Sequence, residues 1–324
     1  MKSKFIGAAL SAMLFALSIP VEAQQQAKVP KIGWLRSNGS GSSLELFRRE
    51  LRTLGYVEGK NLAFEHRSAE GKLDRLPALA EELVRLKVDV LLTSSTEVAL
   101  ALKNATTTIP IVFLFVSDPV AAGLVDSLPR PGGNITGFTN IASVLAGKRL
   151  ELIKETVPKL SRVSVLWDPR TENTAQQWKE SQLASRELGL QLHSMEVSSA
   201  DKYEGAFKEA VKARSSALAV TQHTLASSNQ KRIASLSEKN RLPTIYPRGD
   251  YVVNGGLMSY GPDRTEAYRR GAWMVDKILK GTNPADIPVE QPTKFEFVIN
   301  LKTAKQIGVT IPPQLLARAQ KVIK

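Results

Sequence analysis

The chain has 324 residues, no cysteine and a net charge of +13, with 44 lysine and arginine residues against 31 aspartate and glutamate residues. The lack of cysteine excludes disulfides, thiolate metal sites and a lipid-bearing cysteine. Most of the basic residues fall at helical spacing beside apolar ones, and no nucleic-acid-binding module is recognisable, so we expect no nucleic-acid partner.

The first 23 residues have the pattern of a secretory signal peptide. Lys2 and Lys4 give a positive start, an apolar core covers 5–19, and the residues before Gln24 suit cleavage after about Ala23. The alternative is a membrane anchor, but a core of roughly 15 residues is short of the ~20 that span a bilayer. We therefore expect an exported periplasmic protein, monomeric and without a stable membrane anchor.

The mature chain then alternates strand and helix patterns. Its first half predicts strands at 31–35, 61–66, 88–92, 111–116 and 135–138, and helices at 44–54, 73–85 and 98–103. Short apolar runs that end in polar residues are typical of strands buried on both faces of a parallel sheet. Ligands of such sheets bind beyond the carboxyl ends of the strands, so the polar residues there are the first candidates for a site.

The alternation restarts after Ala146 and predicts a second, similar lobe. The patterns give strands at 162–167, 190–197, 217–221 and 242–246, and helices at 147–157, 174–188, 203–214 and 228–239. The last part predicts a strand at 255–260, a helix at 264–280, a strand at 295–300 and a terminal helix at 315–323. A chain that crosses between lobes several times makes a hinge, and ligand would lie between the lobes.

Enzyme chemistry has little support. No GxSxG, HExxH or Walker sequence occurs, and no cluster of histidine and carboxylate residues has metal-ligand spacing. His66 and His193 lie in strand patterns and are interpreted as structural or surface residues. His223 follows a predicted strand and is a candidate for binding; with Ser227 or Ser228 it is also the one candidate pair for an exported hydrolase.

Three polar segments follow predicted strands. The Gly/Ser loop from Asn38 to Ser43 could present backbone N–H groups to an anion, or be a plain turn with a serine cap. The 94–96 segment precedes a helix, where its hydroxyls suit a carboxylate or simply cap the helix. Asp118 could cap the next helix or receive a ligand ammonium. Among the aromatic residues at strand ends, Trp34, Trp167, Tyr246 and Tyr260, one or two would stack on ligand and the others would pack.

Several motifs stand in the order found in one known family. They are LGYVEGKN at 54–61, AEGKLDRLP at 69–77, SDPVAAGLV at 117–125, RPGGNITG at 130–137, GGLMSYG at 255–261, DKILKG at 276–281, PVEQPTKFEFVINLKTAK at 288–305 and IPP at 311–313. Over nearly the whole mature chain the sequence resembles the ABC-transporter substrate-binding proteins, whose better understood members take up tryptophan and other aromatic amino acids.

The resemblance implies an α/β type I periplasmic-binding-protein fold, with two Rossmann-like lobes of parallel sheet and a three-segment hinge. Lobe 1 would comprise 29–138 and about 261–286, and lobe 2 would comprise 140–258 and about 290–324. The protein would bind an amino acid or related carboxylate, without catalysis, metal or cofactor, and deliver it to a membrane permease driven by a cytoplasmic ATPase.

The expected ligand-binding residues lie on two walls of the cleft between the lobes. Ser94 and Thr96 would hold a carboxylate, Asp118 or Asp250 an ammonium, and Tyr246 or Tyr260 an apolar group. The full set is Asn38, Ser42, Ser94, Ser95, Thr96, Ser117, Asp118, Thr139, Asp168, Gln222, His223, Tyr246, Asp250, Ser259 and Tyr260. Family members mostly have glycine at the positions of Ser95 and Ser117, which makes these two expected specificity positions.

Two alternatives besides the hydrolase are weighed. A periplasmic ligand sensor that partners a membrane receptor kinase could share the fold and the location. A transcriptional regulator with the same two-lobed fold needs a DNA-binding headpiece, and the short segment between the predicted cleavage site and the first strand leaves no room for one.

Overall fold

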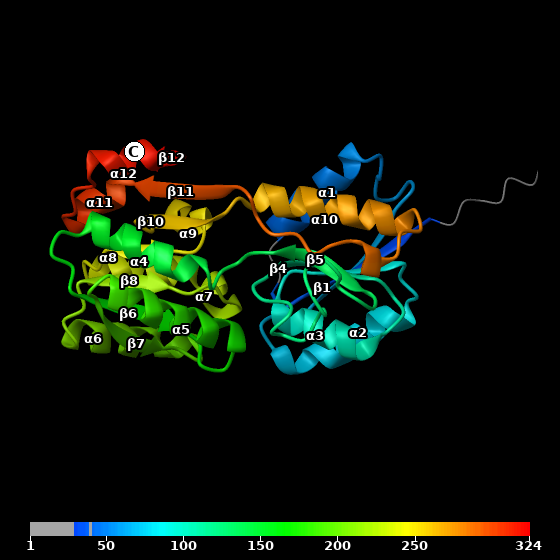
Figure 1. Cartoon of the computed structure of the whole chain (residues 1–324), viewed down its shortest axis with the longest axis horizontal. Coiled ribbons are helices and arrows are strands. Elements are labelled where there is room, and N and C mark those ends of the chain that lie inside the picture. Colours follow the sequence, from blue (N-terminus) through cyan, green and yellow to red (C-terminus); the bar gives the residue numbers. More distant parts are fainter. Residues whose placement is uncertain (1–28, 39–40) are drawn as a thin grey trace, which may run out of the picture.

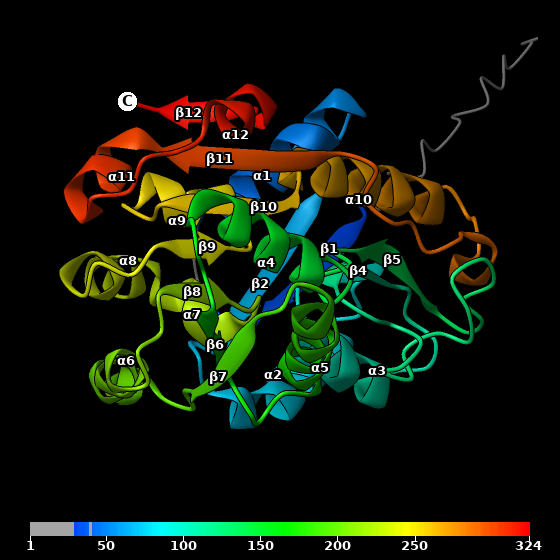
Figure 2. The same cartoon turned by 60° about the vertical axis from the view of Figure 1, so that its left-hand side comes forward.

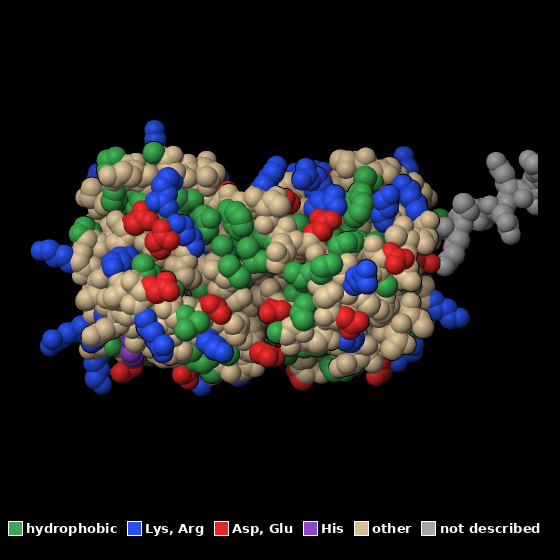
Figure 3. All heavy atoms as spheres, in the orientation of Figure 1, with side chains coloured by type: hydrophobic (Ala, Val, Ile, Leu, Met, Phe, Trp, Pro, Cys, Tyr) green, Lys and Arg blue, Asp and Glu red, His purple; other side chains and the backbone are tan. Residues whose placement is uncertain are grey.

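The computed structural model describes residues 29–38 and 41–324, and shows two α/β lobes side by side (Figure 1). The predicted signal peptide at 1–23 lies outside the described residues, as does the side chain of Ser42. In Figure 3 the surface narrows between the lobes, and apolar side chains gather along this waist on the face in view.

The amino-terminal lobe is built on a five-stranded sheet in the order β2-β1-β3-β4-β5, with every neighbouring pair parallel. Its strands are β1 (Lys31–Arg36), β2 (Ala63–Ser68), β3 (Val90–Thr93), β4 (Ile111–Val116) and β5 (Ile135–Thr139). Every residue of β3, β4 and β5 is buried, which confirms the prediction of all-apolar central strands for the first two.

Helices cover both faces of this sheet. On one face α1 (Gly41–Thr53) packs beside α10 (Arg264–Leu279), a helix from much later in the sequence (Figure 2). On the other face lie α2 (Leu76–Arg85), which follows the short helix η1 (Leu73–Arg75), and α3 (Thr96–Ala105). Leu102 of α3 and Leu83 of α2 are fully buried in the hydrophobic core between these helices and the sheet, as the helical periodicity of apolar residues predicts.

The carboxy-terminal lobe holds a seven-stranded sheet in the order β12-β11-β10-β9-β8-β6-β7. Its strands are β6 (Arg162–Trp167), β7 (Gln191–Glu196), β8 (Ala217–Val220), β9 (Thr244–Tyr246), β10 (Met258–Pro262), β11 (Phe295–Asn300) and β12 (Lys321–Ile323). All pairs are parallel except β10 with β11.

The helices of this lobe also divide between two faces. One core cluster joins the sheet to α4 (Leu145–Thr156), α5 (Glu172–Glu187), α11 (Leu301–Ile307) and α12 (Pro313–Arg318). The other joins it to α6 (Tyr203–Lys212), α7 (Thr224–Ser228), α8 (Gln230–Lys239) and α9 (Gly249–Val253). The short helices η2 (Ala200–Lys202) and η3 (Pro284–Asp286) lie in connections. The two-lobed α/β fold expected from the sequence is therefore present.

The chain crosses between the lobes three times, from β5 to α4, from β10 to α10 and from η3 to β11. The crossings are tied together. Arg149 of α4 donates from Nε to the carbonyl oxygen of Tyr260 at 2.9 Å, so the first crossing is fastened to the end of β10. Thr139 N–H donates to the carbonyl oxygen of Glu290 at 2.8 Å, which joins the first crossing to the third.

The structure differs from the sequence prediction in the short elements near the carboxyl terminus. The helices α9 and α11 were not predicted, because five or seven residues are too few to show a clear period. The predicted terminal helix at 315–323 is wrong in its second half. The helix α12 ends at Arg318, and β12 then pairs with the edge of β11, whose open backbone groups it satisfies.

Candidate functional site

A cavity of about 1010 Å³ lies between the lobes, and the carboxyl ends of strands from both sheets meet at it. The lining residues include Arg36, Ser37, Asn38, Leu46, Ser94, Ser95, Thr96, Glu97 and Phe115 from the amino-terminal lobe, and Asn173, Gln222, His223, Thr224, Arg248, Asp250 and Asn254 from the carboxy-terminal lobe. Asn140, in the first crossing, and Arg264, where α10 begins, also line it.

The end of β3 offers hydroxyl groups to this cavity. Ser95 caps α3, since its Oγ accepts a hydrogen bond from the N–H of Val98 at 3.4 Å. The neighbouring side chains of Ser94 and Thr96 have no hydrogen-bond partner within the described part of the chain. Both side chains are half-buried and line the cavity, so their hydroxyls are available to a bound solute.

The end of β4 carries a local irregularity that faces the cavity. Phe115 has a left-handed φ of 61°, and the register with β5 shifts between Leu114 and Val116. Asn140 holds the irregularity in place, since its Nδ2 donates to the carbonyl of Phe115 at 2.5 Å while its Oδ1 accepts from Ser117 Oγ at 2.9 Å. A non-glycine residue with positive φ is costly, so its presence beside a cavity points to a role there.

Four arginines line the same cavity, and three of them, Arg36, Arg248 and Arg264, lie at or near strand ends or the start of α10. Arg36 ends β1 and lies over the ring of Trp34, with 5.6 Å between its guanidinium carbon and the ring centroid. Arg264 begins α10, lies 4.6 Å from the ring centroid of Phe115, and donates to the hydroxyl of Tyr268 at 2.5 Å. Arg248, between β9 and α9, donates from Nε to Asp250 Oδ1 at 3.0 Å.

The arginines influence one another's proton affinity. Burial lowers the pKa of Arg264, and the positive charge of Arg248 lowers it further. Burial also lowers the pKa of Arg36, with a smaller contribution from the charge of Arg264. The pKa of Arg248 is raised instead, because the attraction of Asp250 outweighs the effect of burial. All three stay positively charged at neutral pH.

The end of β8 contributes two buried groups without partners. Both ring nitrogens of His223 and Oε1 of Gln222 are buried and make no hydrogen bond in the described structure. His223 is 6% exposed, and burial lowers its pKa from 6.5 to about 4, so the ring is neutral at pH 7. Buried polar atoms normally have partners, and their absence at a cavity wall favours contact with a bound molecule.

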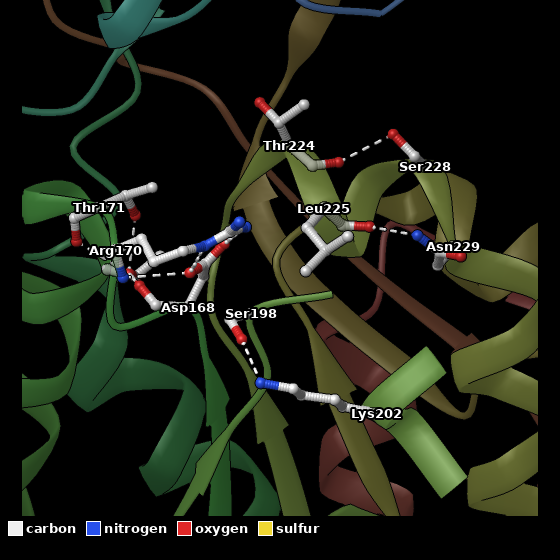
Figure 4. Close-up of polar contacts among 10 residues, drawn as sticks. Asp168, Arg170, Thr171, Ser198, Lys202, Thr224, Leu225, Ser228 and Asn229 are labelled. Carbon is white, nitrogen blue, oxygen red and sulfur yellow. Dashed lines mark hydrogen bonds and ion pairs between the residues drawn. The ribbon is translucent and has the colours of Figure 1, made fainter. Parts of the chain in front are cut away.

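Asp168, a predicted site residue at the end of β6, does not line the cavity. Figure 4 shows its carboxylate turned toward Arg170, which donates from Nε to Oδ1 at 2.9 Å and from Nη2 to Oδ2 at 2.6 Å. Burial alone would raise the pKa of Asp168, but the hydrogen bonds from Arg170 hold it below its usual range. The same view shows Ser228 within α7, where its hydroxyl donates to the carbonyl of Thr224.

The cavity brings together only part of the predicted set. Asn38, Ser94, Ser95, Thr96, Gln222, His223 and Asp250 line it. The residues Ser117, Asp118, Thr139, Asp168, Tyr246, Ser259 and Tyr260 are not among the lining residues. Their part in ligand binding stays a prediction, as does that of Ser42.

Most of the second group have other contacts. Asp118 is exposed and accepts a hydrogen bond from the N–H of Ala121 at 3.0 Å, so it caps the following turn. Tyr246 is fully buried, stacks on Tyr251 with 4.9 Å between ring centroids, and donates to Ser237 Oγ at 3.2 Å. Tyr260 stacks on Phe295 at 5.9 Å between centroids.

The two walls touch at the mouth of the cavity. Ser37 Oγ lies 3.5 Å from Thr224 Oγ1, and Asn38 Nδ2 donates to Ser228 Oγ. These contacts join the loop after β1 to α7 of the other lobe. The lobes are thus joined at the three crossings and also touch through these loop–helix contacts, as expected for a closed arrangement.

No group of three or more histidine, aspartate or glutamate residues with the spacing to hold a metal ion occurs in the described ranges. None of the helices that the structure describes is both long and apolar enough to cross a membrane.

The two α/β lobes, the three crossings and the cavity at the strand ends are those of the type I periplasmic-binding-protein fold. The chain belongs to the ABC transporter substrate binding protein family, whose model matches residues 42–323. This is a family of solute-binding proteins rather than enzymes, and the resemblance inferred from the sequence motifs is confirmed.

Individual relatives agree with this assignment. A tyrosine-binding protein of Clostridioides difficile (strain R20291) is 28% identical over 263 residues, which cover 81% of this chain and 75% of that protein. A conserved domain protein of Vibrio cholerae superposes with a TM-score of 0.85 at 29% identity, covering 91% of this chain and 100% of that one. A Streptococcus pneumonia protein in complex with L-Trp superposes with a TM-score of 0.82 at 26% identity. The match covers 91% of this chain and 99% of that one.

The sequence reasoning missed the charged part of the cavity. Arg36, Arg248 and Arg264 were not candidates, and neither was Phe115. One signal was available for Arg264: a cation in the first turn of a helix faces the positive end of the helix dipole and is unfavourable there without a compensating role. Arg36 directly ends an apolar strand, which is the position from which parallel sheets bind ligands.

Proposed function

We propose that the protein is the periplasmic solute-binding component of an ABC importer. It would capture a small carboxylate-bearing solute, an amino acid or a related acid, in the cavity and deliver it to a membrane permease. The observation that carries this proposal is a cavity of about 1010 Å³ between two lobes. On its walls, groups of Ser94, Thr96, Gln222 and His223 have no hydrogen-bond partner among the described residues. The relatives named for tyrosine and L-Trp support an amino acid or a chemically similar ligand.

The lobes would move as two bodies about the three crossings. We propose lobe boundaries at 29–138 with about 261–286, and at 140–258 with about 290–324. Ligand would favour the closed arrangement because it contacts both walls only there, so binding shifts an equilibrium between open and closed forms. The protein would act as a monomer, exported by the segment at 1–23.

Thermal unfolding against a panel of amino acids, aromatic acids, dicarboxylates and sugars tests solute capture. A ligand that binds only the folded protein raises the melting temperature by mass action, by about 2.7 kcal/mol of stabilisation at a hundredfold excess over Kd. No shift with any solute, and no small molecule released on denaturation of the purified protein, would contradict the proposal.

Transport requires a separate test in the cell. Deletion of the gene should abolish uptake of the radiolabelled ligand that the binding assay identifies, and amino-terminal sequencing of the periplasmic protein should begin after about Ala23. A deletion strain with normal uptake, and with altered signalling through a membrane receptor kinase, would favour the sensor alternative.

A further inference from the structure

The charge of the cavity wall bears on the chemical class of the ligand. Five basic and two acidic side chains line the cavity, namely Arg36, Lys231, Arg232, Arg248 and Arg264 against Glu97 and Asp250. Arg232 forms an ion pair with Glu204, with 2.6 Å between Nη2 and Oε2, so its charge is already compensated. The interior therefore carries an excess of positive charge.

One of the two acidic groups is already occupied. Asp250 accepts from Arg248 through both carboxylate oxygens, and Gln230 Nε2 donates to Oδ2 at 3.0 Å. Burial alone would raise the pKa of Asp250, but the charge of Arg248 and its hydrogen bonds keep it below the usual range. A carboxylate with three hydrogen-bond donors has little capacity left for a ligand ammonium.

The three inner arginines come from both walls. Arg36 and Arg264 belong to elements of the amino-terminal lobe, and Arg248 belongs to the carboxy-terminal lobe. Closure brings them around one space, where their charges repel and are partly removed from water. A bound anion would offset that cost, because guanidinium groups bind carboxylate and phosphate oxygens in paired hydrogen bonds.

Most of the other lining residues have polar side chains. Leu46 and Phe115 are the lining's only purely hydrocarbon side chains among the described residues. Arg264 lies over the Phe115 ring, and Tyr268 meets the same ring edge to face at 5.4 Å between centroids. The Phe115 ring therefore already has two neighbours within the protein.

We propose that the ligand is a small polar anion with at least two negative charges and no ammonium group, most simply a dicarboxylate, bound by Arg36, Arg248 and Arg264. This rests on the proposed function, since it assumes that the cavity is the solute site. Phosphate esters share the same chemistry, so the test includes them beside the carboxylic acids.

Calorimetric titration of the mature protein with matched solutes tests the proposal. Glutarate and glutamate are the matched pair, since both have two carboxylates and only glutamate has an ammonium group. The other solutes are dicarboxylates of three to six carbons, glucose 6-phosphate, tryptophan and tyrosine. A dianion should bind more tightly than every zwitterion, and its affinity should fall as salt rises. If any amino acid binds more tightly, the proposed dianionic ligand is wrong, whereas the proposed solute-binding function stands. Binding by no solute would overturn both.

Single variants test how each charged side chain of the lining contributes to ligand binding. Arg36→Gln and Arg264→Gln should each weaken dianion binding by about tenfold or more, since each removes a charged partner. Glu97→Gln should leave that affinity unchanged or raise it, because it removes the one carboxylate in the lining with no partner in the described structure. Equal loss in Glu97→Gln would mean that Glu97 holds a cationic group, and would overturn the proposal.

The control is Arg318→Gln, which removes a surface ion pair with Glu155 outside the cavity and should bind normally. Melting curves of all variants without ligand establish that they are folded. If the arginine variants are folded and bind the best dianion as tightly as the unaltered protein, the assignment of the three arginines is wrong.

Discussion

Ser37 and Thr224 meet across the cavity, with 3.5 Å between their hydroxyl oxygens, although 187 positions separate them in the chain. One follows β1 of the amino-terminal lobe and the other begins α7 of the carboxy-terminal lobe. The contact joins the two lobes, so we expect it to be present only when they are closed.

The absence of native cysteine makes this contact easy to measure. We expect the double variant Ser37→Cys/Thr224→Cys to form a disulfide under mild oxidation, because closure brings the two positions within the reach of such a bond. Ligand should accelerate the reaction by increasing the closed population. Non-reducing electrophoresis and mass spectrometry measure the product. The two single variants are controls, and a disulfide rate unaffected by a tightly binding solute would contradict the hinge mechanism.

Asn140 is expected to stabilise the first crossing. Its side chain bonds Ser117 Oγ, the carbonyl of Phe115 and the N–H of Ala142, all of them buried. Asn140→Ala leaves these groups without partners and should lower the free energy of unfolding by about 2–4 kcal/mol. Urea unfolding measures the change, and Thr53→Ala at an exposed position is the control. If Asn140→Ala lowers the free energy of unfolding by less than Thr53→Ala does, water replaces the hydrogen bonds of the Asn140 side chain.

His223 should make stability depend on pH. Its pKa is lowered from 6.5 to about 4 by burial, so the unfolded chain binds a proton between these values that the folded chain does not. The free energy of unfolding therefore falls as pH decreases from about 6.5 toward 4, by up to about 3 kcal/mol from this group. Urea unfolding at pH 7, 5.5 and 4.5 tests this.

His223→Asn cannot be protonated in that range and is the comparison. It should lose less stability than the unaltered protein between pH 7 and 4.5. Equal losses in the two proteins would show that His223 is not the group responsible.

Gly137 is required by the close approach of β5 to β4. A Cβ at this position would lie 2.2 Å from the carbonyl oxygen of Phe113 and 2.5 Å from its ring. Gly137→Ala forces these strands apart and should cost about 3 kcal/mol or more, or prevent folding. Soluble yield and urea unfolding measure the effect.

Gly205 is the matched control. It lies inside α6, where a Cβ would meet nothing within 4 Å. Gly205→Ala should stabilise the protein by up to about 1 kcal/mol, because alanine is the better helix former. If both alanine variants behave alike, the crowding at Gly137 is absent in solution.

Local patterns predicted the part of the site that follows the buried strands. Ser94, Thr96, Gln222 and His223 were found because each comes directly after an apolar run, and the cavity lies there. The same rule also selected Asp168, which follows β6 but is held by Arg170 instead. A position after a strand therefore does not ensure a place in the cavity, because which strand ends face the other lobe depends on the order of strands in the sheet.

The charged lining could not be predicted in this way. Arg248 follows a three-residue strand, and Arg264 starts a helix that comes late in the sequence yet packs on the first lobe. Nothing in the spacing of Arg36, Arg248 and Arg264 shows that they are neighbours, since their approach requires the second crossing to return the chain to the amino-terminal lobe.

The sequence by itself determined the alternation of buried strands and amphipathic helices, the two lobes and the family, because apolar periodicity and ordered motifs are local properties of the chain. Only the tertiary structure decided which strand ends share a cavity and what charge that cavity carries. The physical reason is that charge interactions act through space, and these three arginines, far apart in the sequence, line one cavity only in the folded chain.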